Sequence, residues 1–177
     1  TIGVKPVLAK SIIQNIENHL GIDLPSSEDS PGLDTLACIE AAAHGNIDAA
    51  LIMGGNLYQA TPGESWTREA FDKIPLKVFL TTTLNRGHIS GLDNSEAIIL
   101  PVAARDEERQ ATTQESMFNY VRMSDGGIYR LDNVRSEVDI LTNFADLLLD
   151  QRAKDGNIER KFDFKVFEKH KNIREAI

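Results

Sequence analysis

The chain has 177 residues, 41% of them hydrophobic and 26% charged, which is enough for one globular domain with a sizeable core. Its formal net charge of −8 disfavours a nucleic acid as partner, because phosphate backbones select basic surfaces. No apolar run approaches the roughly 20 residues that cross a bilayer, so no membrane association is expected. The opening TIGVKPVLAK lacks a starting Met and a signal-peptide core, as in a trimmed chain or an excised fragment.

The first predicted element is a helix over about residues 7–20, where apolar side chains recur at helical spacing. Gly21 follows it as a plausible stop. The stretch PSSEDSPG, residues 25–32, has the composition of a loop.

A second helix is predicted from about Leu33 to His44, with Asp34 favourable in its first turn and Gly45 as its C-terminal cap. It is apolar nearly all round and is therefore expected to be well buried. Cys38, the single cysteine, lies within it and is expected to be a small core residue. A nucleophile or metal ligand there would need a His or charge partner, and none is near in sequence.

The middle of the chain alternates strands with a helix. DAALIM, residues 48–53, ends in Gly-Gly and is typical of a buried parallel strand followed by a tight turn. A helix is predicted over 67–73, with Ser65 or Thr67 as its N-cap and a proline that stops it. KVFLTTT (77–83) and EAIILP (96–101) are predicted as the second and third strands.

The last third is more polar. Residues 105–114 are predicted as a loop, 116–123 (SMFNYVRM) as a strand, and 125–127 as a turn. Ser136 with Asp139 resembles a capping box that opens an amphipathic helix. The order helix, helix, strand, helix, strand, strand predicts an α/β fold with a mostly parallel sheet.

The first candidate binding feature is Gly54-Gly55-Asn56, directly after the first strand. Ligands of open α/β sheets bind at the carboxyl ends of strands, and glycines there let a backbone approach a phosphate or a ring. The Asn56 amide can serve a base or a ribose. A plain turn is the alternative interpretation, since the motif is not G-x-G-x-x-G.

The second candidate follows the next strand and is expected at the same sheet edge. Its hydroxyl, amide, guanidinium and imidazole groups form a dense polar set in which Arg86 can clamp a phosphate or carboxylate, while His88 is more often structural than catalytic. The members of this set are Thr81, Thr82, Thr83, Asn85, Arg86 and His88.

A third polar run, DEERQ at residues 106–110 after the third strand, is interpreted first as a solvated face, and the alternative is that it points toward a ligand at the same sheet edge. Walker A, CxxC, HExxH and GxSxG motifs are absent, and the four histidines are widely scattered. No catalytic site and no metal site is therefore predicted within the chain itself.

Several motifs in order resemble the alpha subunits of molybdopterin-dependent oxidoreductases of the formate dehydrogenase-like type. They are LIMGGNLYQATP, VFLTTTLNRGHISGLDNSEAIILP, ESMFNYVRMSDGGI and VRSEVDIL. The resemblance covers roughly residues 1–150. It implies a Rossmann-like three-layer α/β domain there, the third region of such an enzyme, with 151–177 as a charged C-terminal extension.

The resemblance also implies a role. Such enzymes hold a bis-(molybdopterin guanine dinucleotide) cofactor with molybdenum, and a 4Fe-4S cluster, in the bacterial cytoplasm. Carried over to this chain, the residues that cradle one guanine dinucleotide arm are Gly54, Gly55, Asn56, Thr81, Thr82, Asn85, Arg86 and His88. The expected partners are that arm and the remaining domains of the parent enzyme, without which the chain is expected to be inactive.

Two other classes of function stay open. A stand-alone Rossmann-type nucleotide-binding or regulatory domain would need its whole pocket within this chain. A non-catalytic interaction module would instead use an apolar face as its partner site.

Overall fold

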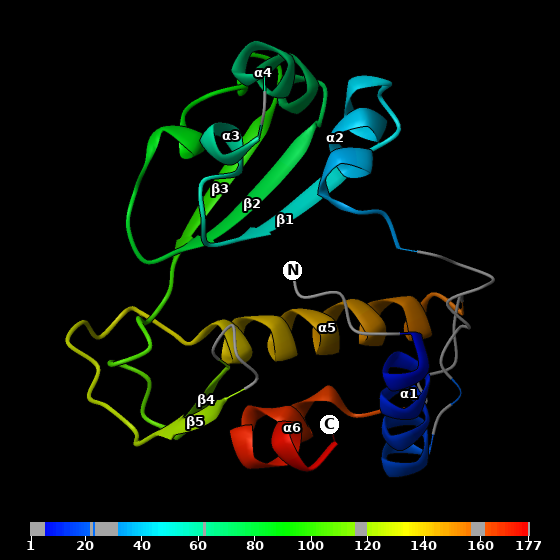
Figure 1. Cartoon of the computed structure of the whole chain (residues 1–177), viewed down its shortest axis with the longest axis vertical. Helices are drawn as coiled ribbons and strands as arrows, with labels where there is room; N and C mark the ends of the chain where they lie inside the picture. The colour runs from blue at the N-terminus through cyan, green and yellow to red at the C-terminus, as the bar shows by residue number, and fades with distance from the viewer. Residues whose placement is uncertain are drawn as a thin grey trace. The chain divides into compact units, whose positions relative to one another are not determined.

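The computed structural model describes residues 6–21, 23, 32–61, 63–115, 120–156 and 162–176. Contacts within the chain define two compact units (Figure 1). Ser27–Val102 form the first, called here the sheet unit, and Thr1–Ser26 with Ala103–Ile177 form the second, called the hairpin unit. Each is described by itself.

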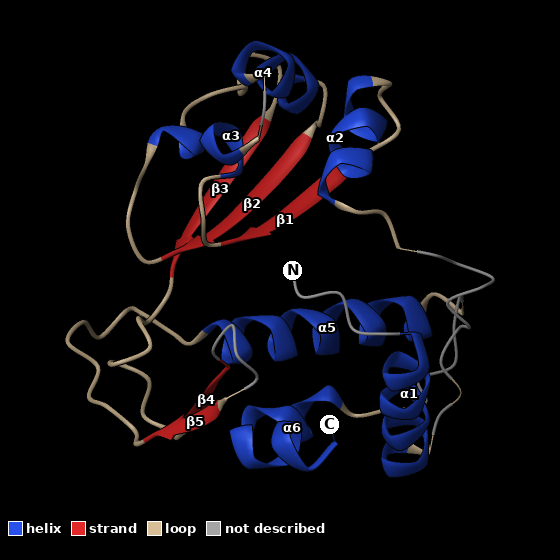
Figure 2. Cartoon of the chain, in the orientation of Figure 1, coloured by secondary structure: helices blue, strands red, loops and turns tan. Residues whose placement is uncertain are grey.

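The sheet unit contains three parallel strands in the order β1-β2-β3, drawn as three aligned arrows in Figure 2. They are β1 (Ala49–Met53), β2 (Leu76–Thr81) and β3 (Glu96–Pro101), each overlapping a predicted strand, with β2 beginning one residue earlier than predicted. Parallel pairing with helices in the connections confirms the predicted α/β class with a parallel, Rossmann-like sheet flanked by helices.

Helices α2 (Thr35–Ala43) and α4 (Glu64–Asp72) pack against one another and supply the core of the sheet unit. The Asp34 side chain caps α2 by accepting a hydrogen bond from the Ala37 amide at 2.8 Å. The short helix α3 (Leu57–Ala60) was not predicted from the sequence. The buried cluster consists of Ile39, Ala42, Ala70, Phe71 and Ile74.

A lysine is buried near the amino end of β2. Lys77 is 0% exposed, and its ammonium donates to the Ile74 carbonyl at 2.9 Å and to the Ser95 hydroxyl. Burial lowers the pKa of Lys77, and the charge of Asp72 partly opposes that shift. Through these two hydrogen bonds, the Lys77 ammonium connects the turn before β2 with the turn before β3.

Over its described residues, the hairpin unit combines a two-stranded antiparallel sheet with three α-helices. The strands are β4 (Thr112–Glu115) and β5 (Val121–Ser124), with Thr113 opposite Met123. The helices are α1 (Pro6–Leu20), α5 (Glu137–Lys154) and α6 (His170–Ala176), with a 3-10 turn, η2 (Phe164–Glu168), before α6.

The C-terminal residues 162–176, expected to be a charged extension, pack against α5 through η2. Phe162, Phe164 and Phe167 form a cluster of aromatic rings with centroids 5.1–6.4 Å apart. Lys165 of η2 lies 3.5 Å from the carboxylate of Asp146 on α5. The aromatic residues and this ion pair anchor a segment whose overall charge suggested solvent exposure.

The structure corrects three local predictions. Cys38 is exposed and Leu36 is 51% exposed, because α2 buries only the side that packs against α4 and the sheet. Helix α4 begins earlier than predicted, with Gly63 as its N-cap in the left-handed region (φ 84°). Residues 112–115 form β4 rather than a loop, since pairing with β5 overrides their polar composition.

Residues 125–127, predicted as a turn, follow β5 and form no turn, helix or strand. Of the strand predicted at 116–123, residues 121–123 lie in β5 and residues 116–119 lie outside the described part of the chain. Among the residues that the structure describes, no helix is both long enough and apolar enough to cross a membrane.

Candidate functional site

The carboxyl ends of β1 and β2 lie side by side, because these strands pair in parallel. Gly54 (φ 60°) and Gly55 (φ 70°) take the chain out of β1 in the left-handed region that favours glycine. The Gly54 amide donates to the Leu80 carbonyl at 2.7 Å and so continues the ladder into the turn. A Cβ built on either glycine would meet no atom within 4 Å, so the turn presents bare backbone.

Asn56 follows the glycines as the N-cap of α3. Its side-chain oxygen accepts from the Gln59 amide at 3.3 Å, and its side-chain nitrogen donates to the Gln59 side chain. The amide expected to meet a base or ribose therefore bonds within its own turn. Gln59 is exposed, so the contact lies at the surface.

The turn after β2 is built by Asn85 and His88. The Asn85 side-chain oxygen accepts from the Gly87 amide at 2.8 Å, while the Asn85 backbone amide donates to His88 Nδ1 at 2.9 Å. The His88 ring is 3% exposed and meets Phe79 edge-on, with centroids 5.1 Å apart. His88 Nδ1 therefore accepts a backbone hydrogen bond within the turn, and the buried ring helps to shape that turn.

One hydrogen bond joins the two turns: the Asn85 side-chain nitrogen donates to the Gly55 carbonyl at 2.9 Å. Gly87, which the sequence reasoning did not select, lies where the two turns meet. A Cβ on Gly87 would lie 2.7 Å from the side-chain oxygen of Asn56. The sequence signal that could have pointed to Gly87 is the presence of a residue without a side chain between Arg86 and His88.

Little space is left between the turns. The hollow lined by Asn56, Tyr58, Asn85 and His88 encloses about 10 Å³, room for about one water molecule. A nucleotide cannot enter between the two turns as they stand. The accessible surface is their outer rim, where Gly55, Thr82 and Arg86 are exposed.

The other predicted residues of the second turn differ in accessibility. The Thr81 hydroxyl is buried and donates to the Thr83 carbonyl at 2.7 Å. Arg86 is exposed, and its guanidinium lies 4.0 Å from the Glu64 carboxylate. An exposed ion pair at this distance contributes little to stability, so Arg86 can turn toward an anion at small cost.

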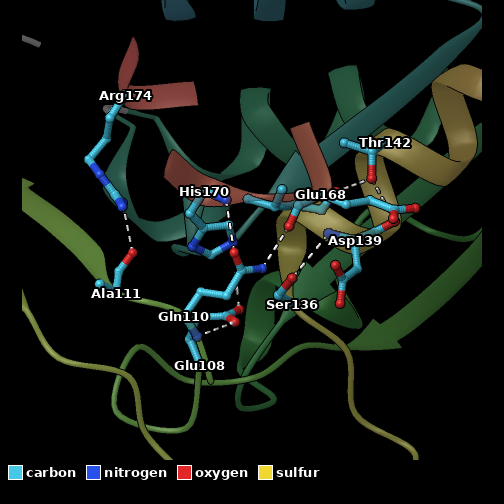
Figure 3. A network of polar contacts seen from close by, with 10 residues as sticks. Glu108, Gln110, Ala111, Ser136, Asp139, Thr142, Glu168, His170 and Arg174 are labelled. Atoms are coloured by element: carbon cyan, nitrogen blue, oxygen red, sulfur yellow. Dashed lines mark hydrogen bonds and ion pairs between the residues drawn. The ribbon is translucent and has the colours of Figure 1, made fainter. Parts of the chain in front are cut away.

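The acidic run at 106–110 belongs to the hairpin unit and takes part in a different network (Figure 3). The Gln110 side chain donates to the Glu168 carbonyl at 2.6 Å and accepts from the His170 amide at 2.9 Å. Glu108 and His170 are both buried, with 4.0 Å between the Glu108 carboxylate and His170 Nε2. The run predicted as a solvated face is thus partly internal, because it holds the C-terminal segment.

Within the described ranges, no group of three or more His, Cys, Asp or Glu side chains is arranged to hold a metal ion. The polar groups at the sheet edge are amides, hydroxyls, bare backbone and the Arg86 guanidinium.

No known family model matches the chain. Over 155 residues, 84% of this chain, it is 30% identical to a Mycobacterium tuberculosis protein named uncharacterized oxidoreductase Rv2900c. It is 26% identical over 158 residues to protein YdeP of Escherichia coli K12. The chain spans only about a fifth of the length of these relatives, 19% and 20% respectively.

Proposed function

We propose that the chain is one cofactor-binding domain of a larger molybdopterin oxidoreductase of the formate dehydrogenase type. In this proposal the β1–β2 edge cradles one guanine dinucleotide arm of a bis-(molybdopterin guanine dinucleotide) cofactor. Two findings support a larger oxidoreductase as the parent protein. The Mycobacterium tuberculosis relative is named an oxidoreductase, and the chain matches only 19% of its length. The motifs around the two turns support the kind of cofactor.

The observation that carries the proposal is the joining of the two turns at one sheet edge by the bond from Asn85 to the Gly55 carbonyl. That edge is where ligands of open α/β sheets bind. The donor set suits a nucleotide: bare backbone at Gly54 and Gly55 admits close approach, and the amides can pair with a purine or ribose.

The residues divide into two roles in this proposal. Thr82 and Arg86, exposed on the rim, would bind the arm directly, Arg86 through its phosphates. Asn85 and His88 would hold the rim in shape, since their polar atoms bond within the turn. Asn56 would exchange its bonds to Gln59 for bonds to the ligand.

The cofactor, when bound, supplies the redox chemistry, while the chain's residues fix its position. Because the hollow encloses only about 10 Å³, the arm in this proposal lies across the rim and other domains complete the pocket. Molybdenum and the 4Fe-4S cluster would be held by those other domains.

The test uses the parent protein with Asn56→Ala and Arg86→Ala, and with Asn133→Ala and Arg152→Ala as matched controls at exposed positions of the hairpin unit. Molybdenum and released guanine nucleotide are measured per mole of protein. We expect both to fall several-fold in the first pair and to stay unchanged in the controls. Normal loading of both rim variants would refute the proposed site.

The alternative is a stand-alone nucleotide-binding domain. Calorimetric titration of the 177-residue chain with guanosine nucleotides separates the two. Because only half of the pocket is proposed to lie in this chain, we expect weak or undetectable binding. A dissociation constant near or below micromolar would favour the alternative.

A further inference from the structure

Helix α5 shows an inverted pattern of exposure. The apolar side chains of Phe144, Leu147 and Leu148 are 57%, 71% and 46% exposed, while the polar Thr142 and Asp146 are each 6% exposed. A helix that buried its apolar side within this unit would show the opposite pattern.

Specific bonds hold α5 in this orientation. The Thr142 hydroxyl donates to the Val138 carbonyl at 2.8 Å, which satisfies it inside the helix. Asp146 lies 3.5 Å from the ammonium of Lys165 on η2, so its buried carboxylate faces a cation. Turning the apolar side inward would move Asp146 away from Lys165 and break this ion pair.

The three exposed residues are spaced i, i+3 and i+4, so they form one stripe along α5. Beside the stripe lies an apolar hollow of about 380 Å³ between α5, η2 and α6, large enough to admit more than one side chain. Phe144 belongs to both the stripe and the hollow. The residues that line the hollow include Leu141, Phe144, Ala145, Phe164, Phe167 and Ile173.

We propose that the stripe and the hollow, together called the α5 surface, bind an apolar helix from the remainder of the parent polypeptide, whose large side chains enter the hollow. The proposal rests on the proposed function only in that the chain is part of a longer protein. About four fifths of the relative's length, 100% less the 19% matched, can supply such a helix.

Size distinguishes this partner from a second copy of the chain. On α5 this surface runs from Leu141 of the hollow to Leu148 of the stripe, which is eight residues or roughly 10 Å of helix. Stable complexes of separate chains bury about 1,200–2,000 Å², much more than two helical turns offer. A segment of the same polypeptide is held nearby at high effective concentration and can use so small a surface.

The test compares Leu147→Asp with Gln151→Asp, an exposed polar position one turn later, in both the parent protein and the 177-residue chain. We expect Leu147→Asp to lower the thermal unfolding midpoint of the parent by roughly 2–4 °C relative to Gln151→Asp. In the 177-residue chain the two variants should unfold at the same temperature, because Leu147 is exposed there.

Three results would overturn the proposal. The two variants could be equally stable in the parent, which would mean that nothing covers the stripe. Leu147→Asp could destabilise the 177-residue chain itself, which would mean that the chain covers its own stripe. Sedimentation could show a dimer that Leu147→Asp dissociates, which would make a second copy the occupant. None of these depends on cofactor loading in the Asn56 and Arg86 variants, so the two proposals fail separately.

Discussion

At the scale of single residues, Gly126 and Gly127 pack their backbone directly against the acidic run. The Gly127 amide donates to the Glu108 carbonyl at 2.5 Å. A Cβ built on Gly127 would overlap the carbonyl oxygen of Asp106, and one on Gly126 would overlap that of Arg109. Backbone on both sides leaves no flexible side chain to move aside, so only glycine fits here.

Gly127→Ala is therefore expected to destabilise the chain by about 1–3 kcal/mol or more, the usual cost of forcing atoms into a packed site. Gly32→Ala is the control, because a Cβ there would meet nothing within 4 Å. Urea unfolding followed by circular dichroism measures both. Equal midpoints for the two variants would show that the loops can separate without cost.

Asp72 offers a test of electrostatics at a single carboxylate. It accepts from the Asn94 amide at 2.8 Å and from the Asn94 side chain, and the first of these contacts does most to lower the pKa of Asp72 below 3.8. A lowered carboxylate pKa stabilises the fold above pH 3.8, and that stabilisation is lost as pH falls through the folded pKa.

Titration of the Asp72 carboxyl by NMR should thus give a midpoint below 3.8. Asn94→Ala should move it only part of the way back, because the backbone donor remains. Asn133→Ala, at an exposed position of the hairpin unit, should leave it in place. A midpoint at or above 3.8 in the unmodified chain would contradict the hydrogen bonding described for this turn.

The sequence predicted that Asn56 and Asn85 would share a sheet edge, since parallel neighbouring strands end together. It could not predict that Asn85 would bond to Gly55 or that the His88 ring would be buried. Those contacts depend on how closely the turns approach in three dimensions. The binding role of these residues stays a prediction.

At the scale of elements, Ser136 shows a capping signal that was confirmed. Its side chain accepts from the Asp139 amide at 3.0 Å and begins α5. Ser136→Ala should cost about 1 kcal/mol, the usual value for a lost N-cap. Ser65→Ala is the matched control, because Ser65 was a predicted cap but lies exposed in the first turn of α4.

Ser65→Ala should be neutral or slightly stabilising, since alanine favours helix. Chemical denaturation of both variants decides between the two serines. A loss of equal size at Ser65 would mean that α4 begins with a side-chain cap after all.

Elements with a strong period were predictable and short ones were not. Apolar runs located β1 and the other two parallel strands, and helical spacing located α1, α2 and α5. The strand β4, with the sequence TTQE, has no apolar alternation, and its pairing with β5 alone defines it. The burial of α2 was overestimated because its apolar character exceeds what one packed side can cover.

At the scale of the whole molecule, the hairpin unit is closed by contacts between residues far apart in sequence. Gln110 bonds to Glu168 and His170, 58 and 60 residues later, through one side-chain amide. Arg174 adds a bond of 2.8 Å to the Ala111 carbonyl. These bonds, labelled in Figure 3, fix the C-terminal segment on which the hollow beside α5 depends.

Gln110→Ala removes both bonds of that amide at once and should loosen residues 162–176. The amides of α6 should then exchange with deuterium at least several-fold faster, because local opening costs less when fewer bonds must break. Gln151→Ala is the control, since the exposed Gln151 side chain bonds to Asp155, four residues later in the chain. Exchange of the β1 and β2 amides reports on the sheet unit, which holds none of the atoms changed. Faster exchange in α6 with unchanged exchange in the sheet would assign the effect to the Gln110 hydrogen bonds. Equal protection of α6 in both variants would show that the aromatic cluster alone holds the segment.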